Sequence, residues 1–155
     1  MGGTKATGFE TYLNDLQEIT EKRCKLFSAD DLDNLDALEE MLKVRAAQIV
    51  GSTALALNMD EDPMQTKWNE KYQVELCEMA TAHIGYVTFL AFREKIETCG
   101  STHGVVSNLT SCIKLFAAHQ LVSDHSALFY SGYLKAKHVP FLKDYYKQQL
   151  KSFRP

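Results

Sequence analysis

Two polar side chains occupy positions that the helical pattern of this sequence reserves for apolar residues. Arg45 lies three residues after Leu42 on a leucine-rich stripe, and His83 lies three residues before Tyr86 on an aromatic one. A buried guanidinium has to be paired and hydrogen-bonded, whereas a buried imidazole is usually kept neutral by one donor and one acceptor contact. Two interpretations of Arg45 therefore stay open: it organises the packing of neighbouring helices, or it meets an anionic ligand or partner. The pattern also leaves open whether Arg45 and His83 touch each other.

The other chemically capable residues do not form a recognisable active site. The sequence contains no G-x-G-x-x-G, G-x-x-x-x-G-K-[ST], G-x-S-x-G or H-E-x-x-H pattern, and no Glu-x-x-His pair of the kind that di-iron bundles use. Ser123, Asp124 and His125 have the residue types of a catalytic triad, but adjacent residues cannot adopt its relay geometry. His119 and His125 are separated by an expected helix boundary, which disfavours a metal pair. We therefore predict no catalytic, cofactor-binding or metal-binding residue in this chain.

The composition is typical of one globular domain with long regular elements. The chain has 155 residues, of which 45% are hydrophobic and 24% charged, and only three prolines and eight glycines interrupt it. No stretch is apolar enough to predict a membrane span, and the first eight residues lack the apolar segment of a secretory signal. We expect an intracellular protein with four buried free thiols, at Cys24, Cys77, Cys99 and Cys112.

Charge is distributed unevenly along the chain. Residues 1–62 carry a net charge of −7 and residues 63–155 a net charge of +4. Six basic residues lie between Lys135 and Arg154, against the single acid Asp144. A nucleic-acid surface is one interpretation of this basic tract, but the tract also has the pattern of a helix with a solvated face, which we favour.

The first half of the chain predicts a lead-in segment and a long helix. Residues 1–28 are expected to be a partly helical lead-in, and residues 29–155 a helical bundle domain. Ser28 followed by Asp31 resembles a capping box that opens a helix over about 29–58. The leucines of that helix recur at steps of three and four, which indicates one apolar stripe facing a core.

A second long helix is predicted after the acidic turn that precedes Pro63. Asp62 is the expected N-cap and Pro63 the first helical residue, and the pattern then continues without a break to about Thr98, where Gly100 can end it. At on the order of 36 residues and roughly 50 Å, this is an unusually long helix for so small a domain. Its apolar side chains lie mainly along one side, so it requires either a bundle or a partner surface to cover it.

The remainder of the chain predicts further helices and no sheet. Ser101 or Thr102 is expected to cap a helix over about 103–121, and shorter helices follow over about 124–130 and 140–153. No period-two pattern persists for more than a few residues. The sequence therefore predicts an all-α helical bundle with one unusually long helix.

Several motifs in these stripes resemble a known family. Four groups of residues occur in the order and at the spacing of the acyl-CoA oxidases, in the segment that follows their flavin domain. They are Y-L-N-D at 12–15 with K-V-R-A-A-Q-I-V at 43–50, K-W-N at 67–69 with A-H-I-G-Y-V at 82–87, L-F-A at 115–117 with F-Y-S-G-Y-L at 129–134, and F-R-P at 153–155. Ile84 and Gly85 depart from the family's A-H-C-H-Y pattern, and the chain stops where family members continue.

The resemblance implies a role as the C-terminal helical domain of a peroxisomal acyl-CoA oxidase. Full-length members are FAD-dependent enzymes that convert acyl-CoA to trans-2-enoyl-CoA and release hydrogen peroxide. Their catalytic glutamate and flavin-binding motifs belong to earlier parts of the chain, so no catalytic residue is carried over, and this chain alone is expected to bind no FAD.

The same resemblance implies the partners and the location of the chain. Expected partners are the flavin-bearing domain of a parent oxidase and a second copy of the chain in a homodimer, with no nucleic acid and no membrane span. The expected location is the peroxisome, although the sequence has no S-K-L-type signal; without the resemblance it would be the cytoplasm. The alternative function is a stand-alone helical interaction module without oxidase activity.

Overall fold

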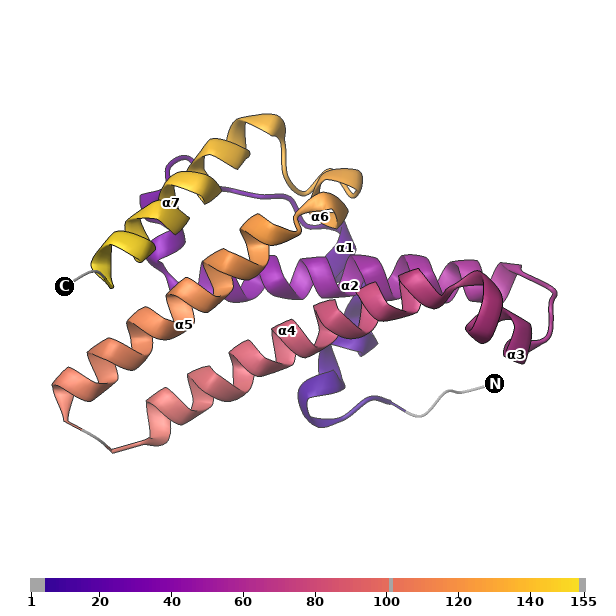
Figure 1. Cartoon of the computed structure of the whole chain (residues 1–155), viewed down its shortest axis with the longest axis horizontal. Helices are drawn as coiled ribbons and strands as arrows, with labels where there is room; N and C mark the ends of the chain where they lie inside the picture. Colours follow the sequence, from indigo (N-terminus) through magenta and orange to yellow (C-terminus); the bar gives the residue numbers. More distant parts are fainter. Residues whose placement is uncertain (1–4, 101, 154–155) are drawn as a thin grey trace.

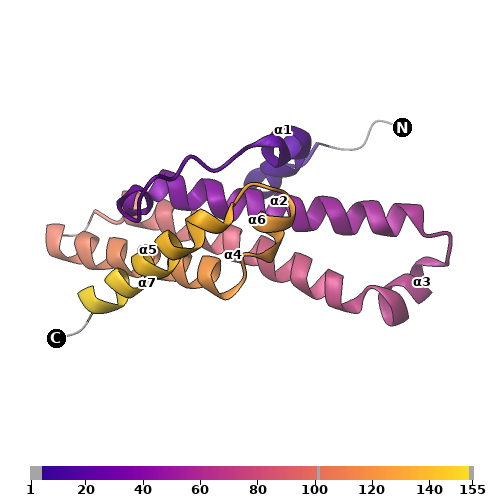
Figure 2. The ribbon, with the colours of Figure 1, turned by 90° about the horizontal axis from the view of Figure 1, so that it is seen from above.

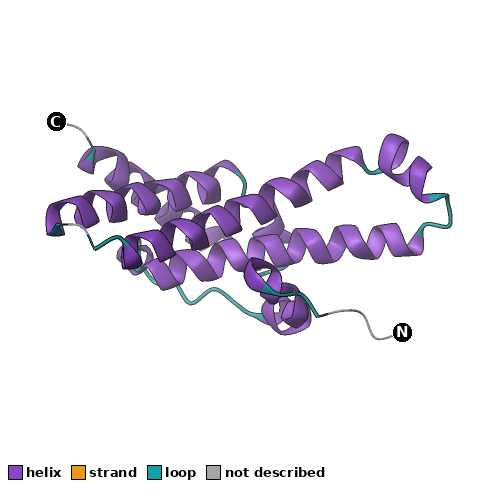
Figure 3. Cartoon of the chain, turned by 90° about the horizontal axis from the view of Figure 1, so that it is seen from below, coloured by secondary structure: helices purple, strands orange, loops and turns teal. Residues whose placement is uncertain are grey.

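The chain folds into an all-α bundle, as predicted. The structure, a computed structural model, describes residues 5–100 and 102–153, and every regular element in that part of the chain is helical (Figure 3). Two long helices, α2 (Leu35–Met59) and α4 (Gln73–Thr98), lie side by side and antiparallel, and α5 (His103–Ser123) and α7 (Val139–Ser152) pack as a second pair (Figure 1).

Short helical segments connect and flank these four helices. They are the 3-10 helices η1 (Gly8–Asp15), η2 (Asp30–Asp33) and η4 (Ala136–His138), the π-helical turn η3 (Lys67–Lys71), and the α-helices α1 (Leu16–Glu21), α3 (Met64–Thr66) and α6 (Ser126–Tyr130). Viewed from above, η1 and α1 lie across the outside of α2 (Figure 2). Their side chains Tyr12 and Ile19 belong to the same buried core as the long helices.

The start of α2 differs from the prediction in a way that its hydrogen bonds explain. The carboxylate of Asp31 accepts the backbone N–H groups of Phe27, at 2.8 Å, and Ser28, at 2.9 Å, which is one half of the expected capping box. A 3-10 turn follows, and the extended backbone of Asn34 then interrupts it. The side chain of Asn34 accepts the N–H of Asp36 and caps α2, so the α-helix begins at Leu35, later than predicted.

The prediction of an unbroken helix from Pro63 to Thr98 is wrong at Tyr72. Pro63 occupies the N-cap position of α3 and is not its first helical residue. The N–H of Tyr72 bonds to the carbonyl of Lys67, a five-residue step that makes a π-turn, and the backbone of Tyr72 leaves the helical region at φ −115° and ψ 24°. Helix α4 then runs to Thr98, and Gly100 follows with a positive φ of 56°, in agreement with its predicted role in ending the helix.

Two further details of the prediction need correction. Thr102 occupies the N-cap position of α5 but makes no side-chain cap hydrogen bond, and Ser101 lies outside the described residues. Cys24 and Cys112 are half-buried free thiols, whereas Cys77 and Cys99 are exposed. The burial predicted for those two cysteines is wrong because Cys77 lies in the part of α4 that precedes its first buried residue, Ala82, and Cys99 lies just beyond the end of the helix.

The core does not extend along the full length of the two long helices. Buried residues of α2 end at Thr53, and those of α4 begin at Ala82. Between them, over residues 54–81, the only buried residue is Lys67. We call residues 54–81 the hairpin tip. It projects beyond the rest of the bundle at the end of the molecule where α3 lies (Figures 1 and 2).

Candidate functional site

Arg45 is buried at the centre of a three-element junction. Its side chain projects from α2 and is only 3% exposed. One terminal nitrogen, Nη2, lies 3.1 Å from the Asp124 carboxylate, and Nη1 donates to the backbone carbonyl of Gln120 at 3.3 Å. The guanidinium therefore joins α2 to the end of α5 and to the loop before α6, and within the described residues its Nε–H has no partner.

Local structure explains why Asp124 lies beside this guanidinium. The Gln120 carbonyl belongs to the last turn of α5, where it also accepts the backbone N–H of Asp124 at 3.2 Å, and a cation near a helix C-terminus is stabilising. Asp124 follows that turn, and its carboxylate accepts the hydroxyl of Ser126 at 2.8 Å. Partial burial alone would raise the pKa of Asp124, but the Ser126 hydroxyl and the charge of Arg45 outweigh it and hold the pKa below its usual range.

These contacts support the packing interpretation of Arg45. An open groove of about 490 Å³ lies beside the guanidinium, between the first half of α4 and the end of α5. Its polar groups include the carboxylates of Glu78 and Asp124, and its one cation, Arg45, is already paired. A groove with that charge repels an anion. The residues that line it are Arg45, Gln73, Val74, Cys77, Glu78, Thr81, Gln120, Ser123 and Asp124.

His83 contacts a different group of residues and does not touch Arg45. The hydroxyl of Tyr12 lies 2.8 Å from Nδ1 of His83, and the two rings stack with their centroids 5.8 Å apart. Tyr12 also packs edge-on against Tyr86, at a centroid distance of 5.1 Å. Burial, with a smaller contribution from Glu10, raises the pKa of Tyr12 to about 12, so its hydroxyl stays protonated at neutral pH.

His119 and His125 make structural contacts of their own. Nδ1 of His125 lies 3.3 Å from the carbonyl of Val122, and Nδ1 of His119 lies 3.3 Å from the hydroxyl of Tyr146. Because Asp124 bonds Arg45 and Ser126, the geometry around it is not that of a Ser-His-Asp relay. No group of three or more His, Cys, Asp and Glu side chains suited to a metal ion occurs within residues 5–100 and 102–153.

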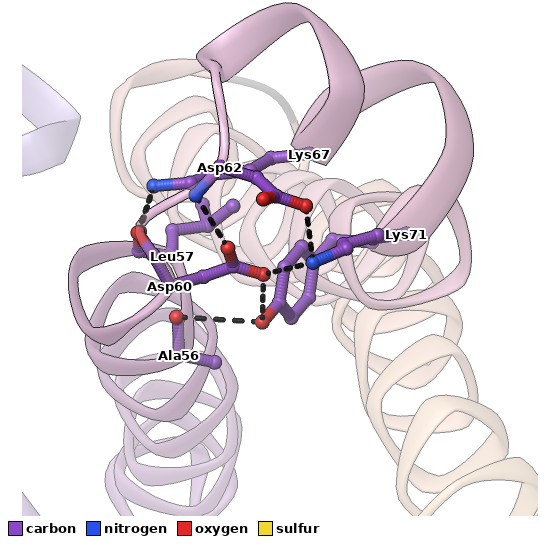
Figure 4. Close-up of polar contacts among 7 residues, drawn as sticks. Ala56, Leu57, Asp60, Asp62, Lys67 and Lys71 are labelled. Carbon is purple, nitrogen blue, oxygen red and sulfur yellow. Dashed lines mark hydrogen bonds and ion pairs between the residues drawn. The ribbon is translucent and has the colours of Figure 1, made fainter.

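The hairpin tip contains a polar cluster that the sequence analysis missed (Figure 4). The ammonium group of buried Lys67 donates to the carbonyls of Leu57, at 2.8 Å, and Asp60, so it caps the C-terminus of α2 from the following segment. Lys71 pairs with Asp60 at 3.0 Å and with Asp62. The sequence contains a pattern that indicates this cluster, since the acidic run D-E-D-P is followed by two lysines that are four residues apart.

Gly85 lies at the contact between α4 and α5. A Cβ atom at this position would lie 3.3 Å from Oε1 of Gln120, the residue whose backbone carbonyl holds Arg45. The departure from the family motif at this position therefore coincides with direct contact between the two helices. Apart from its two neighbours in the chain, no other side chain among the described residues lies within 4 Å of that point.

Comparisons with known proteins define the class to which this bundle belongs. The family model for acyl-CoA oxidase matches residues 34–155, most of the chain. The chain therefore belongs to the acyl-CoA oxidase family, as its motifs predicted. It is 30% identical over 130 residues to mouse peroxisomal acyl-coenzyme A oxidase 1, an alignment that covers 79% of this chain and 20% of that protein.

Two solved structures share the fold. Arabidopsis thaliana acyl-CoA oxidase 1 superposes with a TM-score of 0.87 at 20% identity, covering 97% of this chain. An acyl-CoA oxidase from tomato, Lycopersicon esculentum, superposes with a TM-score of 0.89 at 21% identity, covering 99%. This chain corresponds to 23% of either structure, so it spans about a quarter of the solved relatives and a fifth of the mouse protein.

Proposed function

We propose that this chain is the C-terminal helical domain of an FAD-dependent acyl-CoA oxidase, with a docking role and no catalysis of its own. In this proposal the domain packs on the flavin-bearing part of a parent oxidase in the peroxisome and takes part in a homodimer. The parent would oxidise acyl-CoA to trans-2-enoyl-CoA and release hydrogen peroxide. The observation that carries the proposal is the family match over residues 34–155, combined with relatives four to five times longer.

The groove beside Arg45 does not suit FAD, which supports a role without chemistry. A flavin dinucleotide needs cations or backbone N–H groups around its pyrophosphate. That groove brings together Glu78 and Asp124, with its one guanidinium already committed to Asp124. Flavin binding and substrate oxidation are therefore assigned to the rest of a parent oxidase, and no reaction step is derived for residues of this chain.

The physical character of the surface agrees with a docking role. Exposed large apolar side chains are concentrated on the hairpin tip, where five of them lie on helices without a core beneath. No helix in the described part of the chain combines the length and apolar character that crossing a bilayer requires. A protein surface is therefore the favoured cover for these side chains.

Reconstitution with an oxidase tests the proposal. The mouse oxidase without the region matched here would be produced with and without this chain, and co-purification, bound flavin and acyl-CoA-dependent peroxide would be measured. We expect the chain to co-purify and to restore flavin retention and peroxide release. Peroxide formation by this chain alone with FAD and acyl-CoA would refute its non-catalytic role.

The same experiment addresses the alternative function. A chain that folds cooperatively yet associates with no oxidase flavin domain would favour a stand-alone interaction module. Use of the tomato oxidase in a second reconstitution guards against a simple species mismatch, since both solved relatives share this fold.

A further inference from the structure

The hairpin tip is helical over most of its length, although none of its apolar side chains is fully buried. Over residues 54–81 the only buried side chain is that of Lys67. The tip is held by ion pairs and by carbonyls that accept the Lys67 ammonium. Five large apolar side chains remain at least half exposed on it, namely Leu55, Met59, Met64, Trp68 and Val74. Exposed apolar side chains on a segment that is held in place by polar contacts are typical of a protein–protein contact site.

The tip is also strongly acidic. Residues 54–81 contain six acids and two bases, for a net charge of −4. Lys67 is buried and Lys71 is engaged by Asp60 and Asp62, so neither base is free to offset the remaining charge. Glu61, Glu70, Glu75 and Glu78 have no ion-pair partner among the described residues. A surface that complements the hairpin tip is therefore apolar at its centre and basic at its edges.

A surface of that description lies at the other end of the same molecule. An apolar groove of about 350 Å³ runs between α5 and α7, with Phe116, Tyr146, Leu150 and Phe153 among its lining residues. The segment over residues 135–153 carries five lysines and one acid. The tip, at α3, and helix α7, which lines this groove, lie toward opposite ends of the long axis (Figure 1).

We propose that the hairpin tip of one copy binds the α5–α7 groove of a second copy, with Trp68 as its apolar anchor. The inference rests on the docking role proposed above and names a partner surface for it. A two-fold axis perpendicular to the long axis brings each tip to the other copy's groove, so both contacts form in one closed dimer. The unpaired glutamates of the tip then face the lysines of α7, which gives the contact its orientation.

Sedimentation of matched variants tests the pairing. Trp68→Ala removes the anchor, and Phe27→Ala removes an aromatic side chain that is 82% exposed in the loop before η2, outside both surfaces. We expect Trp68→Ala to weaken the dimer about tenfold or more, and Phe27→Ala to leave it unchanged. Equal dimer affinities for the two variants would overturn the proposal, as would a wild-type chain that stays monomeric at every concentration.

Charge reversal tests the orientation of the contact. Glu70→Lys on the tip and Lys151→Glu on α7 should each weaken the dimer, more at low salt than at high salt. The double variant should regain affinity, because the two opposite charges again face each other. Additive loss in the double variant would contradict this pairing of surfaces.

A disulfide trap locates the contact directly. Cys112 is a free thiol that lines the α5–α7 groove. With oxidised glutathione as the oxidant, an Asn69→Cys variant, which places a thiol on the exposed residue next to Trp68 and keeps the anchor, should form an intermolecular disulfide to Cys112 of the other copy, identified by peptide mapping. Disulfides that join only Cys77 or Cys99 would overturn the assignment.

The outcomes separate this inference from the docking proposal. Each variant would also be reconstituted with the oxidase flavin-bearing part. A dimer insensitive to Trp68→Ala, together with loss of co-purification in that variant, would reassign the tip to the flavin-bearing part and overturn the self-contact. Failure of all variants and of the wild type to co-purify would instead count against the docking role, whatever the dimer shows.

Discussion

The hydroxyl of Tyr12 lies 2.8 Å from Nδ1 of His83 and joins two segments that are 71 residues apart in sequence. Tyr12 stands in the Y-L-N-D motif of η1 and His83 in the A-H-I-G-Y motif of α4. Two of the motifs that indicated the family are therefore in direct contact in the folded chain. This contact fastens the N-terminal segment to the long helices.

Tyr12→Phe should destabilise the chain by about 1 kcal/mol, since it removes one partly buried hydrogen bond and leaves the ring packing intact. Urea unfolding followed by circular dichroism would measure the change. Tyr130→Phe is the matched control because Tyr130 is 92% exposed, and it should have no effect. An equal response from both variants would mean that the Tyr12 hydroxyl contributes nothing.

Arg45→Met should destabilise the chain strongly, with a loss of about 2–3 kcal/mol. It leaves Asp124 without its cation, and breaking a buried pair usually costs about 3–5 kcal/mol, reduced here because Asp124 is partly exposed. Arg45→Lys should recover only part of the loss, since an ammonium cannot reach both Asp124 and the Gln120 carbonyl as the planar guanidinium does. Lys147→Met, which breaks an exposed pair with Asp144, should be almost neutral in the same assay.

Stability should fall as the pH decreases below about 6.5 because of His138. Burial, followed by the charges of Lys137 and Lys135, lowers the pKa of this histidine, and its Nδ1 accepts the Lys135 N–H at 3.1 Å. The unfolded chain then binds a proton at a higher pH than the folded chain does. The stabilisation is therefore complete above the unfolded pKa of about 6.5 and is lost as the pH falls through the lower, folded value.

His138→Gln should flatten this pH dependence, because a glutamine oxygen can accept the same N–H without titrating. His103→Gln is the control, since His103 is exposed at the start of α5 and its loss should leave the slope unchanged. Urea midpoints across the pH range provide the comparison. A slope that survives in His138→Gln would assign the effect to other groups.

Substitutions at Gly85 should separate helix propensity from packing. Gly85→Ala gains about 1 kcal/mol of helix propensity, and the Gln120 amide has only to shift slightly, so we expect a small net change. Gly85→Leu should cost about 2–3 kcal/mol, since the larger side chain forces α4 and α5 apart. Gly51→Leu is the control because a Cβ at Gly51 meets nothing within 4 Å. Thermal melts of the four chains would show the order.

Lys67→Met should loosen the hairpin tip while the bundle stays folded. The substitution keeps the length of the side chain but removes the ammonium that caps the Leu57 and Asp60 carbonyls. Amide hydrogen exchange should accelerate at the end of α2 and across α3, and remain slow around Phe89 and Ala117. Uniform acceleration throughout the chain would instead show that the tip and the bundle unfold as one unit.

Helical segments and their buried residues could be predicted wherever burial makes apolar residues recur at helical spacing. The stripe around Leu42 and the glycine stop at Gly100 are local signals, and both appear in the structure. The π-turn at Lys67–Lys71 could not be read from the sequence, because it depends on an ammonium group that reaches back to the preceding helix. The partner of Arg45 is likewise set by tertiary packing, since Asp124 lies 79 residues away in the chain.

The only tryptophan of the chain, Trp68, lies on the hairpin tip and not in the bundle core. Intrinsic fluorescence therefore reports on a segment held by ion pairs, whereas circular dichroism reports on all the helices. Unfolding curves from the two optical signals should separate, with the fluorescence curve displaced to lower denaturant and further displaced by salt. An analyst who followed tryptophan emission alone would record the opening of the tip and take it for the melting of the whole protein.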